Sequence, residues 1–177
     1  DIKSIRTDLA KFQDKKMAKK VGFVPTMGAL HQGHLSLIAL AKQHCDIVAV
    51  SIFVNQKQFN NPEDYARYPS TLEQDIKLLQ DAGVDILFNP AAQEIYSQDF
   101  FTQIIIAKLT ENLCGKKRAG HFEAVALVVS KLFNIIKPNY VFFGEKDFQQ
   151  LQVIRRLAVD LNFDVEIIAG KTVRESD

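Results

Sequence analysis

Apolar residues along the chain follow two alternating patterns, short continuous runs and stripes at helical spacing. The short runs predict strands at 21–24, 47–54, 85–90, 140–143 and 165–169, with a possible further strand at 102–107. The stripes repeat every three or four residues and predict helices at 35–42, 69–82, 122–136 and 148–161. Strands that are apolar on both sides and alternate with helices are typical of a parallel sheet covered by helices. The pattern therefore predicts one α/β domain, a parallel sheet flanked by helices.

Local signals mark where several of these helices begin and end. Gly83 follows the helix predicted at 69–82, in the position of a C-terminal cap. Lys137-Pro138 stops the helix predicted at 122–136, because the residue before a proline is disfavoured in helical conformation. Asp147 stands just before the helix at 148–161 and is expected to cap it.

The composition excludes several classes of protein. The 177 residues are 47% apolar and 24% charged, as expected for one globular domain. The 22 basic and 21 acidic side chains give a net charge of +1, which provides no field to attract nucleic acid or an anionic membrane. No apolar stretch approaches the roughly 20 residues of a membrane helix. Two cysteines without a CxxC pattern predict reduced thiols, and with no secretion signal we expect a cytoplasmic protein.

The stretch PTMGALHQGH, residues 25–34, joins a predicted strand to a predicted helix. Backbone N–H groups and the helix dipole favour an anion at such a junction, and Gly28 and Gly33 let a ligand approach closely. His31 and His34 share one turn, where they can donate hydrogen bonds to phosphate oxygens and, if protonated, offset phosphate charge. A metal site would need about two more ligands, and none is evident nearby. A structural histidine pair is the remaining alternative, whereas His44 is expected to cap a helix end or face solvent.

Two further loops follow predicted strands in the same way. In FFGEKDFQQLQVIRR, residues 142–156, Lys146 is expected at the carboxyl edge of the sheet, free to meet a phosphate. At least one of Gln149 and Gln150 should be exposed. In FVNQKQF, residues 53–59, Asn55 and Gln58 could hydrogen-bond a small polar ligand. Each loop alone is consistent with a solvated turn, but the fold would bring all three to one crevice at the carboxyl ends of the strands.

Standard phosphate-binding motifs are missing from the sequence. GxGxxG does not occur, and GKKRAGHF at 115–122 has two glycines at P-loop spacing. His121 and Phe122 stand where a P-loop needs lysine and a hydroxyl residue, so we reject a P-loop.

Together these stretches resemble the pantoate–β-alanine ligase (pantothenate synthetase) family over nearly the whole chain. The resemblance is carried by PTMGALHQGH, FVNQKQF, YPSTLEQD, GHF with VVSKLFNIIKP, and FGEKDFQQLQVIRR. It implies a Rossmann-like nucleotidyltransferase domain of the HxGH type. It also implies a two-step reaction, in which pantoate and ATP form pantoyl adenylate and pyrophosphate, and β-alanine then displaces AMP to give pantothenate.

The resemblance also implies roles for individual residues. His34, His31 and Lys146 are the expected catalytic residues. The expected ATP-binding residues are Met27, Gly28, Ala29, Leu30, His31, Gln32, Gly33, His34, Gly144, Glu145, Lys146, Asp147, Val173 and Arg174. Pantoate or β-alanine is expected to contact Asn55, Gln58, Tyr68 and Gln150. Asp75 matches a carboxylate linked to a magnesium site that serves the nucleotide.

The chain departs from the family pattern at four positions and in length. The family usually has other residues at Gln56, Ala119, Ala124 and Leu127. It also continues into a smaller C-terminal domain that closes over the site. Without that lid we expect weak binding and poor turnover.

The resemblance implies a homodimer, with Ile52 and the possible strand at 102–106 offering apolar surface. Two rival functions remain at this point. One is another HxGH nucleotidyltransferase that transfers AMP to a phosphate, such as a phosphopantetheine adenylyltransferase. The other is a non-catalytic nucleotide-binding or dimerisation module.

Overall fold

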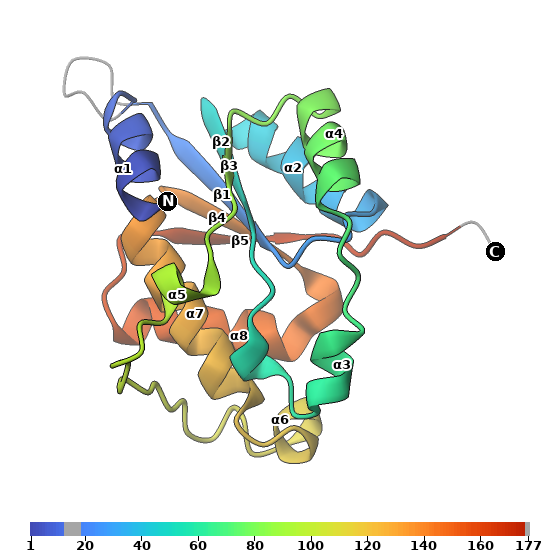
Figure 1. Ribbon diagram of the computed structural model, residues 1–177, viewed down its shortest axis with the longest axis vertical. Helices are drawn as coiled ribbons and strands as arrows, with labels where there is room; N and C mark the ends of the chain where they lie inside the picture. The colour runs from blue at the N-terminus through green and yellow to red at the C-terminus, as the bar shows by residue number, and fades with distance from the viewer. Residues whose placement is uncertain (13–18, 176–177) are drawn as a thin grey trace.

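The computed structural model describes residues 1–12 and 19–175 and contains a five-stranded parallel sheet at its centre (Figure 1). The strand order is β3-β2-β1-β4-β5, so the first strand lies at the centre of the sheet and the later strands lie on both sides of it. The strands are β1 (Val21–Thr26), β2 (Ile47–Ile52), β3 (Ile86–Phe88), β4 (Tyr140–Gly144) and β5 (Glu166–Gly170). The order reverses between β1 and β4, and ligands bind at such a switch point in open α/β sheets.

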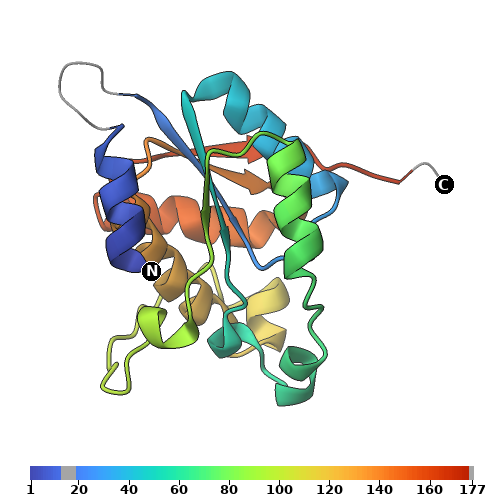
Figure 2. The ribbon, with the colours of Figure 1, turned by 45° about the horizontal axis from the view of Figure 1, so that its top comes forward.

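Helices cover both faces of this sheet, as Figures 1 and 2 show. On one face α2 (Gln32–His44) and α4 (Leu72–Asp81) pack over a core that includes Val24, Ile38 and Leu79. The other face carries α1 (Ile2–Ala10), α7 (His121–Ile136) and α8 (Phe148–Asp160). Helix α7 is apolar almost all round, which fits its position between the sheet, α1 and α8.

The shorter elements gather below the carboxyl ends of the strands in Figure 1. They are α3 (Pro62–Ala66), α5 (Ala92–Ile95), α6 (Leu113–Lys117) and two 3₁₀ turns at Gln56–Gln58 and Glu145–Asp147. None was predicted, because a helix of one turn is too short to show a periodic apolar stripe.

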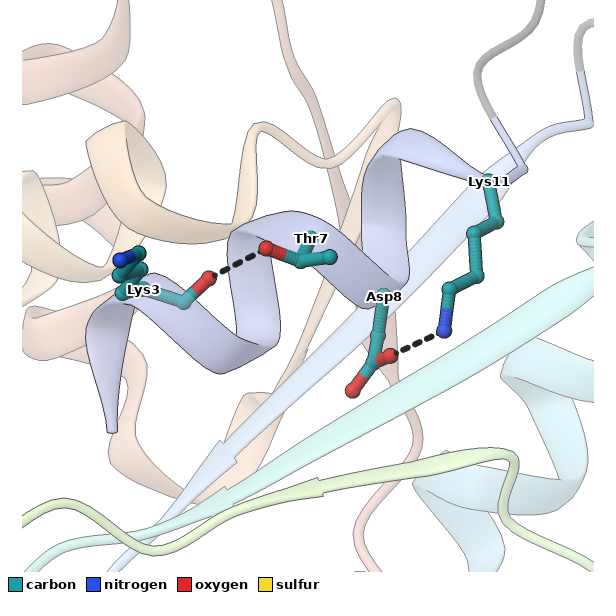
Figure 3. Close-up of polar contacts among 4 residues, drawn as sticks. All are labelled: Lys3, Thr7, Asp8 and Lys11. Carbon is teal, nitrogen blue, oxygen red and sulfur yellow. Dashed lines mark hydrogen bonds and ion pairs between the residues drawn. The ribbon is translucent and has the colours of Figure 1, made fainter.

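Helix α1 was also not predicted, and its own sequence explains why. Asp1 caps it by accepting a hydrogen bond from the Ser4 backbone N–H at 2.7 Å, and only Ile5 and Leu9 are buried. On its polar face Thr7 bonds to the Lys3 carbonyl at 2.9 Å, and the Lys11 ammonium lies 2.7 Å from the Asp8 carboxylate (Figure 3). An exposed pair of this kind contributes only about 0.3–0.5 kcal/mol, so packing against α7 holds the helix in place.

The five predicted strands and four predicted helices are confirmed, and no end is shifted by more than three residues. Helix α4 begins at Leu72 rather than at Pro69, after Thr71 in the N-cap position. Gly83 follows it with a φ of +66°, as the predicted cap requires, and Lys137 closes α7 in a left-handed conformation before Pro138. His44 ends α2 with its Nδ1 2.9 Å from the Leu40 carbonyl oxygen, which agrees with the expected place at a helix end.

Three predictions about this framework are wrong. Residues 102–107 form no strand; Ile106 lies in the core, whereas Ile105 and the preceding Phe101 are 73% and 87% exposed. Ile52 offers no surface for a partner, because it is buried between the sheet and the helices. Asp147 does stand at the N-cap of α8, but its side chain makes no capping bond, since the preceding 3₁₀ turn sets a different backbone angle there.

Candidate active site

A cavity of about 270 Å³ lies at the carboxyl ends of β1 and β4, where the three predicted loops meet. One wall is the loop from β1 into α2, and a second is the turn after β2. The loop from β4 into α8 and the segment 171–173 after β5 complete the polar part. The floor is apolar and comes from α7, through Val125, Val128, Val129 and Leu132. The expected crevice is therefore present, at the switch point of the sheet.

The loop from β1 into α2 turns sharply through two consecutive left-handed residues. Gly28 has a φ of +81° and Ala29 a φ of +51°. A side chain at Gly28 would also press on Asp75 and Ile52, so both its angle and its surroundings require glycine. Ala29 is an L-residue in an unfavourable region, which persists only when surrounding contacts hold it there.

Asp75, on α4, supplies those contacts. Its side chain is 2% exposed and accepts hydrogen bonds from the backbone N–H groups of Ala29 at 2.9 Å and Leu30 at 2.8 Å. Its Oδ2 also accepts a bond from the Thr71 hydroxyl at 3.0 Å. A buried carboxylate needs such donors, because an unpaired buried charge is strongly unfavourable. Asp75 thus holds the loop in shape from behind.

The expected magnesium role of Asp75 does not fit this geometry, because both of its oxygens are already bonded to N–H and O–H donors. Among the residues that the structure describes, no group of three or more His, Cys, Asp or Glu side chains is placed to hold a metal ion.

His31 and His34 form a reciprocal cap at the start of α2. The His31 Nδ1 accepts a bond from the Gly33 N–H at 3.0 Å, and the His34 Nδ1 accepts one from the His31 N–H at 3.3 Å. The ring centroids lie 4.1 Å apart. Because each Nδ1 accepts a backbone hydrogen, each neutral ring carries its proton on Nε2. The pair therefore offers two Nε2–H donors to the cavity that both residues line.

Burial, followed by the neighbouring His31, lowers the pKa of His34 to about 4. His34 is consequently neutral at pH 7, so of the two roles expected for this residue the hydrogen-bond donor remains and the charged form does not. The cause is desolvation, which disfavours the charged form of an imidazole. Its contribution near neutral pH is a directed hydrogen bond.

The backbone of the same loop is less available to an anion than predicted. Thr26 Oγ1 accepts a hydrogen bond from the Gly28 N–H, and the Asp75 carboxylate accepts bonds from the N–H groups of Ala29 and Leu30. The His34 ring accepts a bond from the His31 N–H, and the His31 ring accepts one from the Gly33 N–H. Most of the N–H groups expected to bind phosphate therefore stabilise the loop itself, and the side chains of the histidines become the donors.

The opposite wall, after β4, is charged and exposed. The Lys146 side chain is 74% exposed and its ammonium lies 3.6 Å from the Asp147 carboxylate. An exposed pair at this distance is weak, so the lysine is free to move to an anionic ligand. Lys146, Asp147 and Gln150 all line the cavity.

Amide side chains line the third wall, after β2. Asn55 is 1% exposed; its Nδ2 donates to the Gln58 Oε1 and to the Ala124 carbonyl, each at 3.2 Å. Gln58 in turn places its Nε2 2.9 Å from the Met27 sulfur. Tyr68 stands beside them, and burial followed by the charge of Asp75 raises the pKa of its phenol. This wall is neutral and suited to a small polar molecule.

The structure brings together twelve of the residues predicted for the site. They line the cavity and are Met27, His31, Gly33, His34, Asn55, Gln58, Tyr68, Gly144, Lys146, Asp147, Gln150 and Val173. Seven predicted residues lie outside its lining, namely Gly28, Ala29, Leu30, Gln32, Asp75, Glu145 and Arg174.

Two residues that hold the amide wall of the site were not predicted from the sequence. The Tyr96 hydroxyl donates to the Asn55 Oδ1 at 3.0 Å, and the His121 Nδ1 lies 2.8 Å from the Gln58 carbonyl oxygen. Both are more than 35 residues away from their partners in the chain. No local pattern joins such residues; the GHF motif at 120–122 was the only available signal for His121.

Comparison with known proteins decides the family. The family model for pantoate-β-alanine ligase matches residues 1–177. The chain belongs to the pantoate–β-alanine ligase family. It is 51% identical to the pantothenate synthetase of Pelotomaculum thermopropionicum over 176 residues, which cover 99% of this chain and 62% of the relative. The chain thus spans about three fifths of the length of the curated relatives it matches.

Solved structures of the family share the fold. A pantothenate synthetase from Thermus thermophilus superposes with a TM-score of 0.91 at 46% identity, covering 98% of this chain and 61% of that one. A pantoate-β-alanine ligase from Francisella tularensis, in complex with β-γ ATP and β-alanine, gives a TM-score of 0.95 at 45% identity. That match covers 99% of this chain and 67% of the other. The predicted nucleotidyltransferase-type α/β fold is confirmed.

None of the helices in the described part of the chain has both the length and the apolar character to span a membrane.

Proposed function

We propose that this chain provides the ATP- and pantoate-binding part of an enzyme that condenses pantoate with β-alanine. The observation that carries the proposal is the composition of the cavity. Two neutral imidazole donors and an exposed lysine face a wall of neutral amides across one small space. Polyphosphate suits the first side, and a small hydroxy acid suits the second.

In the first step the carboxylate of pantoate attacks the α-phosphorus of ATP. A carboxylate–phosphorus bond forms, the bond from the α-phosphorus to the bridging oxygen breaks, and pyrophosphate leaves. The Nε2–H groups of His31 and His34 stabilise charge on the phosphoryl oxygens, and Lys146 neutralises the departing phosphates. None of the three forms a covalent bond to the substrate.

In the second step the amine of β-alanine attacks the carbonyl carbon of pantoyl adenylate. The new carbon–nitrogen bond replaces the carbon–oxygen bond to phosphate, the nitrogen loses a proton to solvent, and AMP leaves with pantothenate as the other product. Gln58 and Gln150 hold the pantoyl group through both steps, and Asn55 and Tyr68 complete that wall.

Among the ATP-binding residues expected from the family, we keep a direct contact for the eight that line the cavity. Val173 would contact the adenine. The six others, Gly28, Ala29, Leu30, Gln32, Glu145 and Arg174, would act on the nucleotide only indirectly, by shaping the loops. Magnesium would enter on the phosphates of ATP, because Asp75 is not free to bind it.

The test is exchange of labelled pyrophosphate into ATP, measured with the complete gene product. We expect exchange that requires pantoate and does not require β-alanine. Pantothenate should form only when β-alanine is added. Exchange that depends on a phosphorylated acceptor instead would favour an adenylyltransferase, and no exchange with any acceptor would leave a nucleotide-binding module.

We further propose a cytoplasmic homodimer that uses the exposed apolar residues of the segment after α5, Phe101 and Ile105. Sedimentation of the complete gene product and of a Phe101→Ser, Ile105→Ser variant checks this. The variant should sediment at half the mass. The lid domain implied by the resemblance stays a prediction, checked by assaying residues 1–177 beside the complete gene product.

A further inference from the structure

A single glutamine holds a long exposed segment beside the site. Gln149, in the first turn of α8, accepts hydrogen bonds through Oε1 from the N–H groups of Cys114 at 3.0 Å and Gly115 at 3.4 Å. Its Nε2 donates to the carbonyls of Leu109 and Asn112, each at 2.8 Å. All four partners are backbone groups of residues 109–115. Gln149 therefore fills the inside of this turn.

We call residues 107–120 the strap, since they link the buried Ile106 to the buried His121. Every residue of the strap is exposed or half-buried, so no core side chain anchors it between its two ends. The turn is also tight, because a side chain at Gly115 would collide with the Thr110 carbonyl. With no apolar anchor of its own, the strap relies on polar contacts, and those of Gln149 are concentrated at its middle.

The far end of the strap and His121, the first residue of α7, together hold the backbone of Gln58. The His121 Nδ1 lies 2.8 Å from the Gln58 carbonyl oxygen and an Arg118 nitrogen lies 3.5 Å from it. A carbonyl only accepts, so His121 carries a proton on Nδ1, the opposite nitrogen from His31 and His34. Asn60 adds a bond to the Ala119 carbonyl at 2.7 Å. The turn after β2 is thus fastened to the strap.

The side chain of Gln58 is oriented by Asn55. The Ala124 carbonyl can only accept, so Asn55 must point its Nδ2 toward that carbonyl and toward the Gln58 Oε1. Gln58 then presents its Nε2 on the Met27 side of the cavity. A ligand group bound there must be a hydrogen-bond acceptor, such as a carboxylate or hydroxyl oxygen. This polarity is kept only while the Gln58 backbone stays in place.

We propose that Gln149 is a positioning residue for the acid substrate: it locks the strap, and the strap holds Gln58 through Arg118 and through His121, which directly follows it. The proposal rests on the proposed function, in which Gln58 binds pantoate. It gives adjacent glutamines different tasks, because Gln150 lines the cavity while Gln149 faces away from it into the strap.

The main test is Gln149→Leu in the complete gene product, with Gln152→Leu on the same helix as the matched control. We expect the KM for pantoate to rise about tenfold, while the KM for ATP and kcat stay within about twofold, because positioning groups act on the substrate they orient. The control should leave all three unchanged. Equal increases in both KM values, or none, would overturn the proposal.

Trypsin provides a readout that does not depend on activity. Lys116, Lys117 and Arg118 lie in the strap, so Gln149→Leu should be cut there at least several-fold faster than the wild type or Gln152→Leu. Faster cutting with an unchanged KM for pantoate would show that Gln149 holds the strap but does not position Gln58, and would also overturn the proposal. If the wild type shows no pantoate-dependent exchange, the proposed function fails and the pantoate role of Gln149 falls with it, while the trypsin result still decides the lock.

A second pair of variants covers the case in which Gln149→Leu does not fold. His121→Asn places an amide nitrogen close to the position of Nδ1 and should keep the KM for pantoate near the wild-type value. His121→Gln places its amide near Nε2 and should raise that KM about tenfold. A purely structural histidine would not distinguish the two amides in this way, so equal KM values would count against the strap as the holder of Gln58.

Discussion

The loop from β1 into α2 and the loop from β4 into α8 follow neighbouring parallel strands, yet they are built in opposite ways. The first has its backbone N–H groups bonded internally, a buried carboxylate behind it and two neutral histidines as donors. The second carries three charged residues, Glu145, Lys146 and Asp147, all exposed, and its helix has no side-chain cap. One loop is preorganised and neutral, the other charged and open.

This difference suits two kinds of work on one polyphosphate. A fixed donor stabilises charge at a defined atom without reorganising during the reaction, which favours the reacting phosphoryl group. A long exposed ammonium adapts to phosphates that move as they leave. We therefore expect the first loop to be sensitive to geometry and the second to be sensitive only to charge.

The largest expected effect is on the charged loop. Lys146→Ala should slow pantoyl adenylate formation about 10²–10³-fold, since it removes the cation that meets the phosphates. The melting temperature should stay the same, because the side chain is mostly exposed and its ion pair is weak. Pre-steady-state measurement of pyrophosphate release checks the rate. Lys3→Ala on α1 is the control, and a matching loss there would contradict a specific role.

Two variants of His34 should distinguish its catalytic role from its role in capping α2. His34→Ala and His34→Asn should both slow adenylate formation about 10²-fold, because neither keeps the Nε2–H donor. Only the alanine variant should also lose about 1 kcal/mol of unfolding free energy, since asparagine can still accept the His31 N–H. Urea unfolding beside the kinetic assay measures both quantities. A fully active His34→Asn would exclude the proposed donor.

Asp75 tests whether the neutral loop depends on its buried anchor. Asp75→Asn should lower the unfolding free energy by about 2 kcal/mol. The amide nitrogen, itself a donor, would face an N–H or O–H group whose hydrogen bond the carboxylate now accepts. Asp81→Asn, an exposed acid on the same helix, is the matched control. Urea denaturation gives the values. Equal stability of the two variants would show that the loop holds its shape unaided.

The smallest expected effect is the pH dependence that His34 gives to the stability of the neutral loop. The folded pKa of His34, about 4, lies below the ordinary value of 6.5, so the unfolded chain binds more protons between these two pH values. Stability from this group is complete above pH 6.5 and falls as the pH drops toward 4. Solvent screening of the partly exposed ring limits the difference between pH 7 and 5 to about 1 kcal/mol. Thermal unfolding measured between pH 7 and 5 should show a larger loss of stability for the wild type than for His34→Asn. Parallel stability–pH profiles of the two proteins would contradict this contribution of His34.

Most of the fold could be predicted from local patterns, and half of the site from those patterns together with the family resemblance. Apolar periodicity located the five strands and the long helices, and strand-end loops identified His31, His34, Lys146 and Gln58. The same reasoning failed where a partner is remote in sequence. The family resemblance gave Asp75 a magnesium role, and no local pattern reveals that the N–H groups of Ala29 and Leu30 occupy its oxygens. The segment at 102–107 looked like a strand because an apolar run does not show whether a neighbouring strand is available.

The sequence by itself determined the α/β class, the family and the residue types that meet at the carboxyl edge, because these depend on periodicity and on motifs of a few residues. Only the tertiary structure decided which atoms those residues present. The backbone bonds at Nδ1 set the proton of His31 and His34 on Nε2, and burial keeps His34 neutral. The Ala124 carbonyl sets the sense of the Asn55 and Gln58 amides. Donor direction and protonation depend on neighbours that folding brings from elsewhere in the chain, so no local pattern carries them.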